Sequence, residues 1–140
     1  PAVAIMANKF AKEVDFFSIG TNDLTQYTLA VDRTNDQVDR LFEHDHPAIW
    51  KLVQQIQLAA QNENIEVSVC GELASTLLGA SGLIGLGVRN LSMKPSAIIS
   101  VKKWIHTYTL SEFELFASKI VKVQDREQVH QLFSTIFHRS

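Results

Sequence analysis

The chain has 140 residues, a formal charge of −2 and 46% hydrophobic residues. This length suits one globular domain with a buried core, and the composition excludes a disordered chain. The small charge gives no basis for binding nucleic acid or an anionic membrane, and no apolar stretch reaches the roughly 18 residues of a membrane span. The single cysteine, Cys70, excludes an internal disulfide and favours a reducing, cytoplasmic compartment.

The first predicted element is a helix over residues 2–12. Proline is favoured at the first helical position, so Pro1 fits a helix start, and no initiator methionine precedes it. We therefore expect residues 1–140 to be a fragment, forming one piece of a single domain of a longer protein.

Residues 15–20 predict a short apolar strand that is buried on both faces. Thr21 or Asn22 is placed to cap the amphipathic helix that follows and that ends near Arg33. Polar side chains that follow a buried strand are typical of ligand sites in α/β proteins, since such sites form at the carboxyl ends of parallel strands.

Helices and strands alternate along the rest of the chain. The predicted elements are a helix over 48–62 begun by Pro47, a strand over 67–70, a short apolar helix over 73–80, a glycine-rich turn through Gly82, Gly85 and Gly87, a strand over 90–93, and helices over 95–106, 111–121 and 125–138. This order predicts an α/β fold with parallel strands and right-handed crossovers. A TIM (β/α)₈ barrel needs eight strands and about 250 residues. The chain is therefore interpreted as the C-terminal part of such a barrel, with about three βα units and further helices.

Four side chains are candidates for chemistry, and each has a structural alternative. Asn22 and Asp23 fit a helix cap, or a site in which Asp23 binds Mg²⁺ and Asn22 contacts a phosphate oxygen. Cys70 fits a buried apolar residue, or a proton donor, acceptor or nucleophile at the end of its strand. Arg33 fits a solvent-facing cation that pairs with Asp32, or a fork for a carboxylate or phosphate.

The histidines show no zinc-ligand spacing, and His44-Asp45-His46 is interpreted as a surface loop. The glycine-rich stretch 79–87 lacks the P-loop lysine and the dinucleotide spacing, so it predicts a turn rather than a phosphate cradle.

Several motifs together resemble one family. FFSIGTNDLTQYTLAVDR, the His46-Pro47 helix start, VCGELA and LSM are similar to the phosphoenolpyruvate-utilising enzymes, above all to enzyme I of the bacterial phosphotransferase system. VSVCGELA and VRNLSM lean toward its nitrogen-regulatory paralogue. Pyruvate phosphate dikinase and phosphoenolpyruvate synthase share TNDLTQ but diverge after it. The resemblance covers essentially the whole chain.

The resemblance implies a function and a set of roles. The expected activity is transfer of phosphate from phosphoenolpyruvate to a protein histidine and on to a phosphocarrier protein, with release of pyruvate. Asp23 would be a Mg²⁺ ligand, Asn22 a contact to the phosphoryl group and Arg33 a contact to phosphoenolpyruvate. Cys70 would protonate the enolate carbon. A cytoplasmic homodimer is expected.

The resemblance also has limits. Ser75-Thr76 stands where the family has glycine and an acidic residue, which puts the loop beside the thiol in doubt. The second metal-binding carboxylate, the arginines of the early strands and the phosphorylated histidine would lie before Pro1. We therefore expect the fragment alone to be inactive. The alternatives are a non-catalytic dimerisation or interaction module, or a fragment of pyruvate phosphate dikinase or phosphoenolpyruvate synthase.

Overall fold

The computed structural model describes residues 1–138 and contains a parallel sheet of three strands. The strands are β1 (Phe16–Gly20), β2 (Glu66–Cys70) and β3 (Asn90–Ser92), and they lie side by side in chain order. The predicted α/β fold with parallel strands is therefore confirmed. Consecutive parallel strands joined through helices are the arrangement of successive βα units in a barrel.

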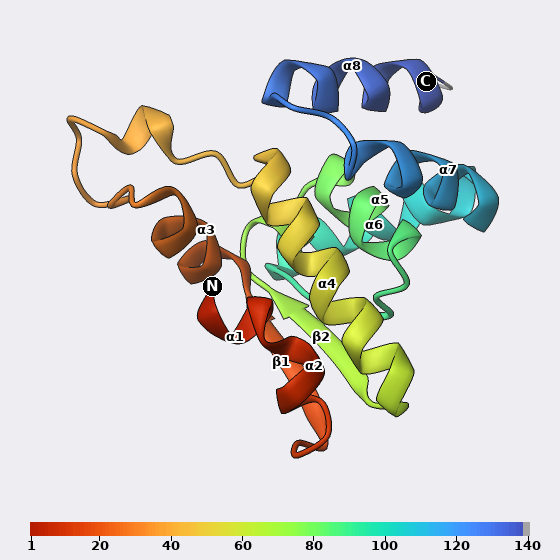
Figure 1. Ribbon diagram of the computed structural model, residues 1–140. Coiled ribbons are helices and arrows are strands. Elements are labelled where there is room, and N and C mark those ends of the chain that lie inside the picture. Colours follow the sequence, from red (N-terminus) through yellow and green to blue (C-terminus); the bar gives the residue numbers. More distant parts are fainter. Residues whose placement is uncertain (139–140) are drawn as a thin grey trace.

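Helices connect and cover these strands. Their bounds are α1 (Ala2–Ile5), α2 (Ala7–Phe10), α3 (Thr21–Leu29), α4 (Pro47–Glu63), α5 (Leu77–Gly85), α6 (Pro95–Thr107), α7 (Leu110–Ile120) and α8 (Arg126–Ile136), with short 3-10 turns η1 (Asp39–Leu41) and η2 (Leu73–Ser75). Figure 1 shows α4 running beside the sheet, with α7 and α8 at the opposite end of the molecule from α1 and α2. No described helix is long and apolar enough to cross a membrane.

The sheet has one covered face and one open face. Ile19, Val67 and Val69 are at most 5% exposed and join the core with residues of α4. Successive side chains of a strand point to opposite faces, so Phe16, Ser68 and Cys70 lie on the other face. Phe16 is 61% exposed, so the prediction that the first strand is buried on both faces was wrong. Among the described residues, helices cover only one side of it.

Two predicted helices have different bounds. The helix expected over residues 2–12 is split into α1 and α2 at Met6, whose ψ of 14° departs from helical geometry. The helix expected to end at Arg33 ends at Leu29, because Ala30 adopts a left-handed conformation with φ 54°. Arg33 therefore lies in the following loop.

The glycine-rich stretch is mostly helix, which corrects the predicted turn. Gly82 and Gly85 lie inside α5, and Gly87 (φ +101°) forms the turn that follows. A methyl group on Gly82 would meet the Trp50 ring at 2.6 Å, and one on Gly85 would meet the Phe113 carbonyl oxygen at 2.0 Å. These glycines allow α5 to approach α4 and α7 closely, which offsets their low helix propensity.

The C-terminal helices pack around aromatic rings. Trp104 of α6 lies against Phe133 of α8 with ring centroids 5.5 Å apart, and Phe116 of α7 lies 5.8 Å from the same ring. The Trp104 indole also donates a hydrogen bond to the Ser81 hydroxyl of α5 at 2.8 Å. The two C-terminal helices are thus joined to the core rather than extending from it.

Candidate functional site

The three strands end level with one another. Gly20 is paired with Cys70, and Cys70 with Ser92, so the last residues of β1, β2 and β3 form one edge of the sheet. The segments that leave this edge carry most of the candidate residues. The parallel register therefore brings together positions that lie tens of residues apart in the sequence.

The side chains of Thr21 and Asn22 form hydrogen bonds with the end of β2 and the loop after it, and they do not cap α3. Gly20 is the residue before the helix and has no side chain to cap it. The Thr21 hydroxyl donates to the Cys70 carbonyl oxygen at 3.0 Å, and the Glu72 backbone N–H donates to Asn22 Oδ1 at 3.1 Å. The predicted cap was therefore wrong, since both side chains reach across to the neighbouring βα loop.

Gly71 makes this close approach possible. Its φ of +117° lies in a region that other residues rarely adopt. A Cβ at this position would lie 2.3 Å from Thr21 Oγ1 and 3.1 Å from Asn22 Oδ1. Both the backbone conformation and the space therefore require glycine directly after Cys70.

Cys70 and Asn22 line one cavity of about 240 Å³ at this edge. Its other lining residues are Gly71, Glu72, Ser75, Ser92, Met93 and Lys94. Cys70 is exposed, so it is not the buried apolar residue that the structural alternative predicts. The residues that line this small cavity thus include one with a thiol, one with an amide and one with an ammonium group.

Asp23 and Arg33 lie close to each other but outside this lining. Arg33 Nη2 is 3.8 Å from Asp23 Oδ1, with side chains 42% and 72% exposed respectively. Asp23 instead lines a separate cavity beside β1 and α1. The candidate residues therefore form two pairs, Asn22 with Cys70 and Asp23 with Arg33.

Asp32, next to Arg33, closes a tight turn. The Thr34 backbone N–H and hydroxyl donate to Asp32 Oδ1 at 2.9 and 2.7 Å. These two hydrogen bonds, with a smaller contribution from the positive charge of Arg33, hold the pKa of Asp32 below its ordinary value.

The His44-Asp45-His46 segment makes side-chain contacts with α4, α8 and Glu72, so the prediction of a plain surface loop was wrong. Asp45 is 7% exposed, and its carboxylate contacts Arg126 and His130 of α8. His46 caps α4, because its Nδ1 accepts a hydrogen bond from the Ala48 backbone N–H at 3.1 Å. His44 Nε2 lies 2.9 Å from Glu72 Oε2 at the edge of the sheet.

Lys94 and the His44–Glu72 pair are features of the site that sequence reasoning missed. Lys94 was detectable, because it closely follows the third predicted strand as Asn22 follows the first. The pairing of His44 with Glu72 had no signal in the sequence, since 28 positions separate the two residues.

Asp23 is the Mg²⁺ ligand that the sequence predicts in this region. No group of three or more His, Cys, Asp or Glu side chains among residues 1–138 is arranged to hold a metal ion. Mg²⁺ is commonly held by one or two carboxylates together with substrate phosphate and water. The exposed Asp23 carboxylate fits such a ligand, with Asn22 adjacent to it in the first turn of α3.

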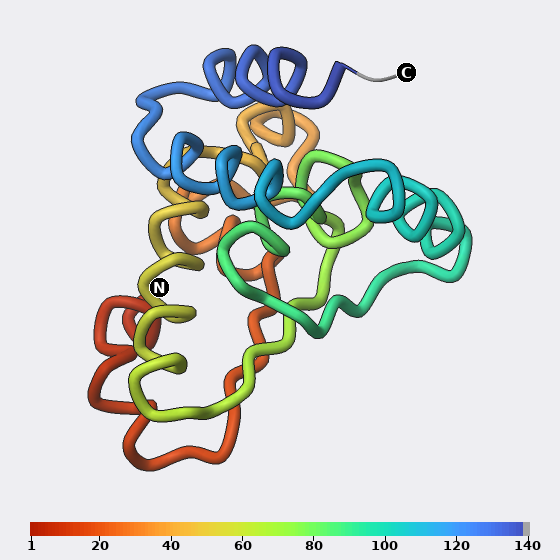
Figure 2. The backbone as a smooth tube through the Cα atoms, turned by 90° about the vertical axis from the view of Figure 1, so that its right-hand side faces the viewer, coloured from red at the N-terminus to blue at the C-terminus, as the bar shows by residue number. Residues whose placement is uncertain are grey.

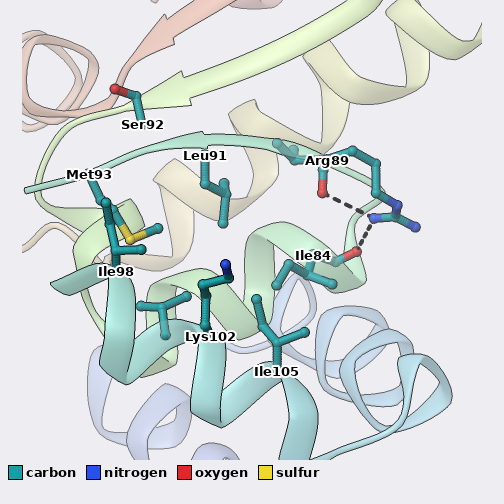
Figure 3. A pocket seen from close by; sticks show the side chains of 10 residues that line it. Ile84, Arg89, Leu91, Ser92, Met93, Ile98, Lys102 and Ile105 are labelled. Atoms are coloured by element: carbon teal, nitrogen blue, oxygen red, sulfur yellow. Dashed lines mark hydrogen bonds between the residues drawn. The ribbon is translucent and has the colours of Figure 1, made fainter. Parts of the chain in front are cut away.

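A larger cavity of about 580 Å³ lies between β3, the end of α5 and α6. Figure 3 shows Leu91, Ile98 and Ile105 projecting into it, while Arg89 turns aside to the carbonyl oxygens of Ile84 and Val88. This cavity is a mostly apolar groove and has little of the polar character of the Cys70 cavity.

Comparisons with known proteins match most of the chain to one family. The family described as "PEP-utilising enzyme, PEP-binding domain" matches residues 1–110. The chain is 42% identical over 133 residues to phosphoenolpyruvate-protein phosphotransferase of Borreliella burgdorferi, with 95% of this chain and 23% of that protein covered. It is 40% identical over 138 residues to the Priestia megaterium protein of the same name, covering 99% of this chain and 24% of the relative. Identity to the Bacillus subtilis protein of that name is 42% over 129 residues, or 92% and 23% of the two chains.

The chain belongs to the family of PEP-utilising enzymes, within the PEP-binding domain. It spans about a quarter of the length of these relatives. Most of α7 and all of α8 lie beyond the matched residues.

Proposed function

We propose that this chain is part of a phosphoenolpyruvate-protein phosphotransferase, the enzyme that passes phosphate from phosphoenolpyruvate to a protein histidine and on to a phosphocarrier protein. The observation that carries this proposal is the cavity shared by Asn22 and Cys70 at the carboxyl edge of a parallel sheet. Ligand sites of α/β folds form at this edge. The names of the relatives support the same activity.

Cys70 is proposed as the proton donor of the reaction. Phosphoryl transfer breaks the bond between phosphorus and the enol oxygen, and its electrons stay on the enolate that remains. The enolate carbon must then take up a proton to become pyruvate. The exposed Cys70 thiol can deliver this proton, and the resulting thiolate regains one from water.

The other candidate residues would bind the substrate. The Asn22 amide can donate to a phosphoryl oxygen, and the Arg33 guanidinium can bind the carboxylate or phosphate of phosphoenolpyruvate. Asp23 is the proposed ligand of Mg²⁺, which when bound would supply positive charge beside the phosphoryl group. The Asp23–Arg33 pair is exposed on both sides, so either side chain is free to turn toward a ligand at little cost.

Substitution of Cys70 tests this assignment in the full-length protein. Cys70→Ala is expected to slow exchange of pyruvate methyl protons at least about a hundredfold, because it removes the proton donor. Ser68→Ala is the matched control, since Ser68 lies on the same strand and the same face of the sheet as Cys70 but does not line the cavity. Unchanged proton exchange in Cys70→Ala would leave Cys70 a structural residue and overturn the assignment.

The 140-residue chain alone is expected to show no phosphotransfer. One carboxylate and one arginine are too few groups to hold Mg²⁺ and phosphoenolpyruvate in a reactive geometry. Incubation of the purified chain with phosphoenolpyruvate and a phosphocarrier protein, followed by measurement of pyruvate, checks this. Pyruvate formed above the uncatalysed background would contradict it.

Self-association is a second candidate function. Ile98, Ile99 and Ile105 of α6 are 42%, 67% and 37% exposed, and Ile98 and Ile105 line the apolar groove (Figure 3). Such a surface supports contact with another apolar surface, as in a homodimer. Sedimentation velocity of the chain with and without Mg²⁺ and phosphoenolpyruvate separates the two functions. Concentration-dependent association without ligand binding would favour an interaction module.

The cellular setting is also a proposal. One cysteine and the relatives' activity support a cytoplasmic enzyme. The nitrogen-regulatory subtype remains a prediction, because the relatives' names do not specify it.

A further inference from the structure

Residues 44–46, here called the clamp segment, are fixed to the start of α4. The Trp50 indole N–H donates to the Asp45 carbonyl oxygen at 3.0 Å, and Trp50 is fully buried. His46 accepts the Ala48 backbone N–H, so it completes the amino-terminal end of the same helix. The segment therefore has a fixed position relative to the core.

The clamp segment is also fixed to α8. Arg126 Nε donates to Asp45 Oδ1 at 2.7 Å, and His130 Nε2 lies 2.6 Å from Asp45 Oδ2. The Asp45 side chain is 11% exposed, so water compensates its charge poorly and the two partners from α8 stabilise it. Figure 2 shows α8 crossing above the part of the chain that contains this segment. A helix beyond the matched family region thus contacts the loop beside the candidate site.

His44 extends from the clamp segment to the edge of the sheet. Its Nε2 lies 2.9 Å from Glu72 Oε2. The Phe42 ring packs edge-on against the imidazole, with the two ring centroids 4.8 Å apart. His44 Nδ1 is buried and has no hydrogen-bond partner among the described residues. A buried orphan nitrogen costs free energy, so His44 is a poor choice if its role were stability alone.

Glu72 connects this contact to the site. Its backbone N–H donates to Asn22 Oδ1, and it lies two residues after Cys70, directly after Gly71. We propose that His44 is a positioning residue: it holds Glu72, and with it the Cys70–Glu72 turn, where the thiol and the Asn22 amide share one cavity. Through Asp45, α8 anchors His44. A catalytic consequence of this positioning rests on the proposed function, whereas the positioning itself does not.

Amide hydrogen exchange of Glu72 in the purified chain tests the proposal without any substrate. His44→Ala is expected to speed exchange of the Glu72 amide about tenfold relative to the Val69 amide of β2, because the Glu72 side chain loses its contact with His44. His44→Gln keeps an N–H donor and is expected to restore most of the protection. The matched control is His106→Ala, which changes an exposed histidine of α6. A Glu72-to-Val69 ratio that stays at the wild-type value in His44→Ala would overturn the proposal.

A second pair of variants tests the anchor on α8. Arg126→Ala is expected to raise Glu72 exchange about threefold, and adding it to His44→Ala is expected to raise it no further, since both act through one chain of contacts. Glu127→Ala changes the adjacent residue of the same helix and serves as the control. If the two substitutions together multiply their separate effects on Glu72 amide exchange, the proposal that α8 anchors His44 would be overturned.

Failure of the proposed function is separately visible. In the full-length protein, His44→Ala is expected to lower the rate of pyruvate proton exchange about tenfold. If Cys70→Ala leaves that exchange intact, the function proposed for Cys70 fails. Hydrogen exchange of the Glu72 amide would still show whether His44 positions the Cys70–Glu72 turn.

Discussion

The two faces of the sheet differ in composition and in role. Val67 and Val69 alternate in β2 with Ser68 and Cys70; the valines are buried under helices, and Cys70 is exposed. The same alternation gives β1 Ile19 on the covered face and Phe16 on the open one. One short strand thus stabilises the fold with every second residue and presents polar groups with the others.

The largest expected change in the free energy of unfolding comes from comparing two adjacent residues of β2. Val69→Ala is expected to lower the free energy of unfolding by about 2 kcal/mol, because it leaves a cavity at a fully buried site. Ser68→Ala is expected to change it by less than about 0.5 kcal/mol, since the hydrogen bond from the Ser68 hydroxyl to the Phe17 carbonyl oxygen is long at 3.4 Å. Urea denaturation measures both. Equal losses would contradict the division into two faces.

The two glycines at the edge of the sheet provide the next comparison. Gly71→Ala is expected to cost about 1–2 kcal/mol, because φ +117° is strained for alanine and its Cβ would collide with Thr21. Gly20→Ala is the control, since Gly20 has φ −83° and its nearest contact for a Cβ is Asp23 at 4.0 Å. Thermal unfolding of both variants checks this difference. A larger loss in Gly20→Ala would show that Gly71 is not the constrained position.

Two buried threonines of α3 test whether the link across the edge stabilises the protein. Thr21→Val removes the donor to the Cys70 carbonyl oxygen and is expected to cost about 1 kcal/mol. Thr25 is equally buried, but its hydroxyl has no partner among the described residues. Thr25→Val is therefore expected to be neutral or stabilising. Chemical denaturation that ranks the two in the opposite order would contradict the importance of the link.

The smallest expected effect is a change in the pKa of Asp32, which lies in an exposed turn next to Arg33. Its pKa lies below the ordinary value of about 3.9, because Thr34 donates two hydrogen bonds to the charged form. A depressed pKa contributes stability that is present above the unfolded-state value and is lost as the pH falls through the folded-state value. Thr34→Val is expected to raise the pKa, as measured by an NMR titration of the Asp32 carboxyl. An unchanged pKa would mean that the hydroxyl contributes nothing.

Much of the fold was predictable because its signals are local. Pro47 begins α4 and Pro95 begins α6 as expected, since proline suits the first turn of a helix. The first strand was predicted from a short apolar run and the other two from short segments between predicted helices, and their parallel order follows from those helices. The burial of β1 was not predictable, because it depends on which neighbours cover each face.

The candidate site was predictable only in its location. Asn22 and Cys70 were placed at strand ends by sequence, and they do line one cavity. The hydrogen bond from Glu72 to Asn22 was not foreseeable, because Thr and Asn after a strand are also typical of a cap. The internal glycines of α5 were likewise misassigned, since close packing against Trp50 and Phe113 leaves no local signal.

The level ends of Gly20, Cys70 and Ser92 limit how this sequence can change in length. Deleting one residue within β2 would exchange the positions of Val69 and Cys70, so the thiol would enter the core and a valine would face the cavity. The same deletion between residues 35 and 38 would only shorten a loop. Insertions and deletions in natural variants should therefore collect in that loop and avoid the three strands.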